Sequence, residues 1–87
     1  MTVVRIPSPL FSYTDAKAEV DSRGATLRDV LADLDGRFPG FRFRIVDEQE
    51  RIRPTIVITV SGERAGDLSA PVGPSDVVQI VAALSGG

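Results

Sequence analysis

The 87-residue chain has no cysteine and no histidine, and these two absences remove most of the chemistry that a small protein can perform alone. Without cysteine it can form no disulfide, no thiolate zinc site and no thiol nucleophile. Without histidine it lacks the commonest general base and the commonest metal ligand. A glycine-rich phosphate loop ending in Lys-Ser or Lys-Thr is also missing. We therefore expect a chain that is not an enzyme and that binds no cofactor or metal by itself.

Charge and hydropathy exclude two further classes of partner. The net charge is −2 and the isoelectric point is near 4.9, whereas a nucleic-acid-binding protein needs a basic face. No apolar run approaches the ~18 residues of a membrane span. The first six residues lack the basic, apolar and small-residue order of a signal peptide. The length is that of one domain, so we expect a single cytoplasmic domain with no nucleic-acid or membrane partner.

Two alternating or β-branched segments near the start predict a hairpin. Residues 3–6 form an apolar run that ends at Pro7, and residues 16–21 alternate Ala16, Ala18 and Val20 with charged residues. A turn is expected over residues 9–14. Its aromatic residues, Phe11 and Tyr13, either mark a protein interface or close one end of the core.

The clearest predicted element is a helix that begins after Thr26. Thr26 is a good N-cap, and Asp29 three residues later makes an approximate capping box. The apolar residues fall on one stripe, and Pro39-Gly40 ends the helix. Leu27, Val30, Leu31, Leu34 and Phe38 make up that stripe.

Residues 41–53 leave the secondary structure open. The sequence Phe-Arg-Phe-Arg-Ile at 41–45 alternates like a strand, but a short helix would place Phe41 and Ile45 together on the core. Asp47, Glu48 and Glu50 lack the glycine and spacing of a calcium loop, so we interpret them as a solvated loop. The arginines form either a docking patch or an ordinary charged face; they are Arg42, Arg44, Arg51 and Arg53.

The last third predicts two strands and a tail. Residues 55–60 are nearly all β-branched and predict a buried strand, with a turn at Ser61-Gly62. Residues 63–74 predict a loop with a short edge strand near Leu68. Residues 77–81 predict the last strand. We expect an α+β mixed sheet with one main helix on one face, forming a domain over residues 1–82 with a flexible Gly-Gly tail at 83–87.

This element order, closed by Gly86-Gly87, resembles the ubiquitin-like (β-grasp) sulfur carriers. That family includes the molybdopterin synthase small subunit and the carriers of thiamine and cysteine synthesis. The resemblance spans essentially the whole chain and is carried by the sequence ATLRDVLADL at 25–34, by RFPGF at 37–41 and by the ending SDVVQIVAALSGG. The family's usual Asp-Gly-Asp turn before the last strand is replaced by Pro74-Ser75-Asp76, which keeps one aspartate.

The resemblance implies a function for the C-terminus. An ATP-dependent, adenylating (E1-like) enzyme would activate the Gly87 carboxylate, sulfur would replace AMP, and the resulting thiocarboxylate would donate sulfur to a synthase. ATP would be used by that partner and not by this chain. Only Gly86 and Gly87 match the family's functional ending. Leu84 is apolar and follows the last predicted strand with little core to join, so from its own character we expect it, with Ser85 and Gly86, to be recognised inside the partner. A glycine pair suits a narrow channel because glycine has no side chain and has wide φ/ψ freedom.

A different class of function uses the same terminus. A ubiquitin-like modifier would be adenylated in the same way and then joined through Gly87 to lysines of target proteins. Lys17 is the only lysine, which leaves little scope for polymeric chains and favours the carrier. A plain β-grasp binding module whose glycines are incidental is the third alternative.

Overall fold

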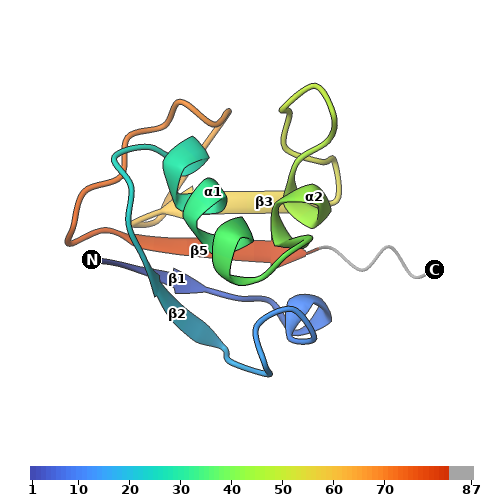
Figure 1. The fold of residues 1–87 in the computed structure, drawn as a ribbon. Helices are drawn as coiled ribbons and strands as arrows, with labels where there is room; N and C mark the ends of the chain where they lie inside the picture. The colour runs from blue at the N-terminus through green and yellow to red at the C-terminus, as the bar shows by residue number, and fades with distance from the viewer. Residues whose placement is uncertain (83–87) are drawn as a thin grey trace.

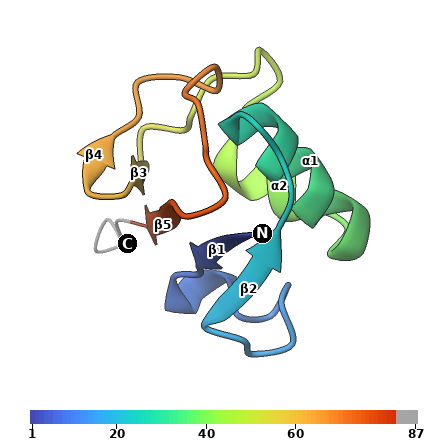
Figure 2. The same ribbon diagram turned by 90° about the vertical axis from the view of Figure 1, so that its left-hand side faces the viewer.

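The computed structural model describes residues 1–82, which fold around a five-stranded sheet with the strand order β2-β1-β5-β3-β4 (Figure 1). β5 runs parallel to β1, and the other neighbouring strands are antiparallel. Two helices cover one face, and the opposite face is open (Figure 2). The elements are β1 (Thr2–Arg5), η1 (Ser8–Leu10), β2 (Glu19–Ser22), α1 (Leu27–Arg37), α2 (Phe41–Ile45), β3 (Ile56–Val60), β4 (Glu63–Arg64) and β5 (Val77–Ala82). The predicted α+β, β-grasp fold is confirmed.

The core lies between the sheet and the helices, where alternate strand residues meet the apolar stripe of α1. Val78 and Ile80 of β5 and Ile58 of β3 are each at most 2% exposed. Their neighbours Val57 and Val81 point to the open face, as the two-residue period of a strand requires. The β-branched run at 56–60 therefore forms a strand with one buried face.

α1 begins and packs as its sequence predicts. The Thr26 hydroxyl accepts the Asp29 amide hydrogen at 3.3 Å, which satisfies one of the unpaired N–H groups of the first turn. The Asp29 carboxylate accepts from the Ala25 amide at 3.3 Å, one residue before the position of a regular capping box. Phe38 is the C-cap and packs against the core from its edge, half-buried. The four residues of the stripe within the helix are all fully buried: Leu27, Val30, Leu31 and Leu34.

The ambiguous segment is a helix, and the exposure of its aromatic residues shows why. Phe41 and Ile45 are fully buried, whereas Phe43 is 55% exposed. A strand would have placed these three side chains on one face, so only a helix buries the first and third while releasing the second. Tyr13 meets the Phe41 ring edge-on at 6.5 Å and packs, with Phe11, against the core. The two aromatic residues therefore close one end of the core.

The predicted second strand starts three residues too early. β2 begins at Glu19, and Ala16 and Ala18 are exposed. Pro9, within the short helix η1, favours a helical start, and the chain then turns through positive φ at Asp15 and Ala16 (54° and 64°). Pairing with β1 is antiparallel, so the predicted hairpin itself is confirmed.

The predicted edge strand near Leu68 is also misplaced. The edge strand is β4, directly after the Ser61-Gly62 turn, while Leu68 and Val72 are buried in the core. The carbonyls of Leu68 and Ala70 accept the amide hydrogens of Arg28 and Leu27, each at 3.0 Å. This loop therefore satisfies backbone groups that the first turn of α1 cannot pair internally.

Candidate functional site

β5 carries the chain towards its C-terminus through the centre of the sheet. It lies between β1 and β3, and its last residue, Ala82, stands opposite Ile56 and packs against the core. Residues 83–87, the predicted tail, lie outside the residues that the structure describes. All four predicted site residues fall in this segment: Leu84, Ser85, Gly86 and Gly87. The described sheet thus places Ala82, the residue that these predicted site residues follow in the sequence.

The turn into β5 is held by Asp76. One carboxylate oxygen accepts the Gly73 amide hydrogen at 2.7 Å, and the other accepts the Ser61 hydroxyl at 2.8 Å. The Val77 amide in turn donates to the Ser61 hydroxyl at 3.2 Å. The Gly73 amide, and then the Ser61 hydroxyl, hold the pKa of Asp76 below its ordinary value. In the sequence, Asp76 is notable only as the one aspartate kept from the family's usual turn; in the structure, its carboxylate links Gly73 and Ser61.

The open face of the sheet combines a row of polar residues with an apolar pair. Arg5 and Glu19 form an ion pair at 3.3 Å across β1 and β2. Val57 and Val81 stand opposite each other on β3 and β5, one residue before the end of β5, and Val81 is 43% exposed. The alternation of residues in the two strands predicts that Val57 and Val81 each lie on the face opposite their buried neighbours. It does not predict which face of the sheet the helices leave open.

The acidic loop holds itself together. The Asp47 carboxylate accepts the amides of Gln49 and Arg51 at 2.9 and 3.0 Å, and these bonds lower its pKa, led by that from Arg51. Glu50 pairs with Arg42 at 2.9 Å and with Arg28 at 3.6 Å. No group of carboxylates within residues 1–82 is arranged to hold a metal ion. The interpretation as a solvated loop agrees with this internal pairing.

The four arginines around this loop do not act as one patch. Arg42 and Arg51 pair with carboxylates of the loop. Arg44 and Arg53 instead lie over the rings of Tyr13 and Phe43, with 5.6 and 4.7 Å from guanidinium carbon to ring centroid. The structure therefore divides the predicted set into two paired arginines and two that are stacked on aromatic residues.

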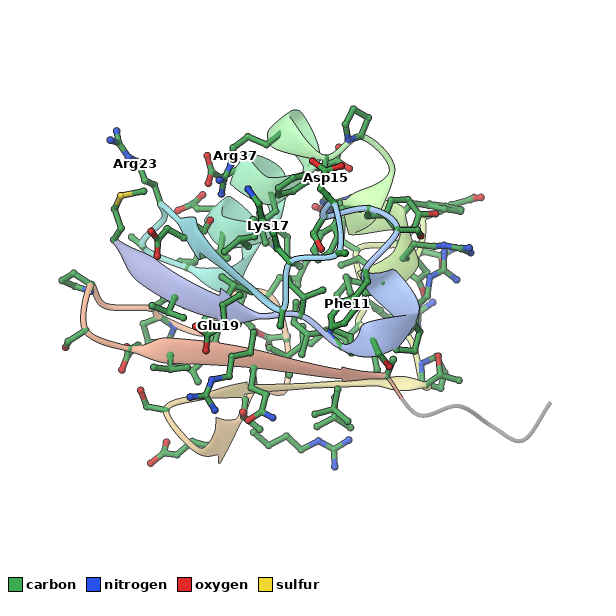
Figure 3. The ribbon with its side chains drawn as sticks, turned by 90° about the horizontal axis from the view of Figure 1, so that it is seen from below. Phe11, Asp15, Lys17, Glu19, Arg23 and Arg37 are labelled. Atoms are coloured by element: carbon green, nitrogen blue, oxygen red, sulfur yellow. The ribbon has the colours of Figure 1, made fainter. Side chains whose placement is uncertain are left out.

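Lys17 lies in the loop that leads into β2, near the outer edge of the sheet. Figure 3 shows it with Asp15, Glu19 and Arg37 around β2. Arg37 donates to the Asp21 carbonyl and pairs with Asp33 at 3.1 Å, which covers part of this edge strand. The side chain of Lys17 is exposed, so the only lysine of the chain is accessible to a partner.

Over the same residues 1–82, the two longest helices have 11 and 5 residues, and neither is long and apolar enough to cross a bilayer.

Known proteins match this chain over nearly all of its sequence and share the fold of the described residues. The model of the ThiS family matches residues 4–87. The sulfur carrier protein CysO of Mycobacterium tuberculosis is 29% identical over 89 residues, covering 97% of this chain and 96% of that protein. The crystal structure of an Amycolatopsis orientalis BexX/CysO complex contains a chain that is 31% identical, with a TM-score of 0.92 and complete coverage of both chains.

A more distant neighbour shares the fold. The small archaeal modifier protein 1 of Methanosarcina acetivorans has a TM-score of 0.80 and 23% identity over 99% of this chain and 95% of its own. The nearer relatives are named as carriers and not as enzymes. The family match and the fold together show that this chain belongs to the ThiS family of ubiquitin-like sulfur carriers.

Proposed function

We propose that the Gly87 carboxylate is adenylated by an ATP-dependent partner and converted to a thiocarboxylate that donates sulfur. The observation that carries the proposal is the extent of the family match, which runs through residue 87 and so includes the Gly86-Gly87 ending. The position of β5 in the described sheet supports it, because this strand is paired on both sides and its last residue, Ala82, lies at one end of the sheet.

The chemistry explains why a partner is needed. A carboxylate with a pKa of about 3.5 is an anion at neutral pH and a poor electrophile. Attack of one carboxylate oxygen on the α-phosphorus of ATP releases pyrophosphate and leaves an acyl-adenylate. A sulfide nucleophile then forms the C–S bond while the C–O bond to AMP breaks, so AMP leaves and the product is a thiocarboxylate. The chain has no phosphate loop, thiol or histidine for these steps.

The relatives support a carrier that works with a protein partner. The Amycolatopsis orientalis relative was crystallised in a complex with BexX, and by similarity we expect this chain to present its C-terminus to an activating enzyme and to a sulfur-accepting synthase. Leu84, Ser85 and Gly86 are the residues that we expect such a partner to contact. Conjugation through Gly87 to protein lysines is the alternative outcome, because it shares the adenylation step.

Intact mass tests the proposal. The chain is incubated with ATP, sulfide and an adenylating enzyme from the same organism, and the expected product has one oxygen of the C-terminus replaced by sulfur. Two control variants retain the folded domain: one lacks Gly87, and one carries an added alanine after it. Both should stay unmodified. Exchange in either control would contradict the assignment to Gly87, and ladders of larger protein species in lysate would favour conjugation.

A further inference from the structure

Two arginines, Arg44 within α2 and Arg53 shortly after it, lie over aromatic rings and form no ion pair with a carboxylate of residues 1–82. Arg53 stacks on Phe43 and donates its Nε hydrogen to the Phe43 carbonyl at 2.8 Å. Arg44 lies over Tyr13. The segment 41–54 has four arginines against three carboxylates, in a chain whose net charge is −2. It is therefore a local positive region on an acidic protein.

Stacking prepares these guanidinium groups to bind an anion. The ring and the Nε bond fix the orientation of Arg53, and its remaining N–H groups are left for a partner. Less side-chain entropy is lost on binding when a side chain is already ordered. Phe43 adds an apolar contact, since it is 55% exposed beside the guanidinium group of Arg53. The combination suits an acidic peptide segment that also carries an apolar residue.

A groove of about 170 Å³ lies beside Arg53. Arg53 and Arg64 both line it, and neither forms an ion pair with any residue that the structure describes. Its remaining walls come from the chain around Pro54, from β3 and from the start of the loop after β4. A carboxylate side chain placed in this groove would meet two cations, whereas a cationic side chain would be repelled.

The positive region lies at the end of the molecule where β5 finishes, close to the C-terminus on which the proposed partner acts. The Ile56 amide donates to the Arg53 carbonyl at 2.9 Å, and Ile56 stands opposite Ala82. In Figure 1, α2 lies over the C-terminal end of β5. Five residues follow Ala82, and five residues span at most ~17 Å. A protein that acts on Gly87 must therefore approach this end of the molecule.

We propose that Phe43, Arg44, Arg53 and the adjoining groove form a docking surface for an acidic, extended segment of the protein that acts on the C-terminus. The identity of that partner rests on the proposed function, but binding of the segment does not. A symmetric dimer through this surface is disfavoured, because it would bring the same positive surface against itself.

A peptide titration tests the surface without ATP or any enzyme. The probe is an acetylated and amidated heptapeptide with six acidic residues around a central leucine, and its control replaces the acids with the matching amides. The ¹⁵N-labelled full chain is titrated at low salt. We expect saturable shifts at Phe43, Arg44 and Arg53, with binding weakened at 0.3 M salt, where the screening length falls to about 6 Å.

Two double variants of equal net charge distinguish the effect of this surface on peptide binding from the effect of the overall charge. R44E/R53E and K17E/R23E change the net charge equally, and the second pair lies by β2 (Figure 3). We expect R44E/R53E to weaken binding at least about fivefold and K17E/R23E less than about twofold. If charge reversal unfolds the domain, the neutral variant R44Q/R53Q is used to repeat the test.

Equal losses in both pairs, shifts centred elsewhere, equal binding of the amide control peptide, or no saturable shift at millimolar peptide would each overturn the docking surface. None of these results bears on sulfur exchange at Gly87, which the intact-mass experiment decides.

Discussion

The carboxylate of Asp76 accepts the Ser61 hydroxyl at 2.8 Å, and this bond ties the turn after β3 to the start of β5. The same carboxylate accepts the Gly73 amide at 2.7 Å, so one side chain links two turns at the entrance to the central strand. β5 positions Ala82, and with it the origin of the tail. The stability of this junction therefore bears on the presentation of the C-terminus.

Removing either member of this pair should lower the free energy of unfolding, and the two losses should not add. D76A removes the acceptor. S61G removes the hydroxyl, and glycine readily adopts the positive φ of 48° at that position. Because the residues share a bond, the double variant should lose less than the sum of the single variants. Urea unfolding of the four proteins measures this, and strict additivity would show that the bond contributes nothing.

Acid should destabilise the protein as its aspartates protonate. The Ser22 hydroxyl chiefly lowers the pKa of Asp33, the Ser69 hydroxyl that of Asp67, and the bonds described above those of Asp47 and Asp76, all from an ordinary value of 3.8. A pKa lowered by folding contributes stability above the unfolded value, and that stability is lost as the pH falls through the folded value. Thermal midpoints should thus fall below pH ~4. In D76A the fall should be smaller, and an unchanged acid dependence would contradict the role of that carboxylate.

Leu68 should behave as a core residue although it lies in a loop. It is 1% exposed, and L68A should cost about 2–5 kcal/mol because it leaves a cavity in the packed interior. V81T on the open sheet face keeps a β-branched side chain and should change stability by less than about 0.5 kcal/mol. Chemical denaturation of both variants makes the comparison, and similar costs would mean that the loop does not pack as described.

Sequence patterns predicted the regular elements well and the irregular ones poorly. The stripe of α1 and the β-branched run of β3 repeat over enough residues for their period to be read. The five residues of α2 do not, and their conformation depends on whether Phe43 joins Phe41 in the core, which is decided by tertiary packing. The edge strand predicted near Leu68 is wrong and the burial of this residue was not predicted, since an isolated apolar residue among Gly, Ala and Pro carries no period. The stacking of Arg53 on Phe43 joins residues ten apart and follows only from the fold.

Two glycine-to-alanine substitutions should have opposite effects. Gly24 has φ of +155°, and a Cβ there would lie 2.7 Å from both the Asp29 Cβ and the Val30 nitrogen, so G24A should cost at least about 1–3 kcal/mol. Gly36 lies within α1 with nothing within 4 Å of its added Cβ, so G36A should stabilise by up to about 1 kcal/mol. Thermal unfolding measures both, and a tolerated G24A would disprove the tight packing of that turn on α1.

Deleting Gly86 and Gly87 should leave the thermal midpoint nearly unchanged and abolish sulfur exchange. Strand pairing in the described residues ends with Ala82 opposite Ile56, and terminal residues beyond the last paired position contribute little to folding. A chain that ends at Gln79 is the matched control. It loses Ile80, which is 2% exposed, together with the pairings of Val81 and Ala82, and should unfold at a clearly lower temperature. A large loss from the two-glycine deletion alone would mean that the glycines serve the fold, which would count against the carrier proposal.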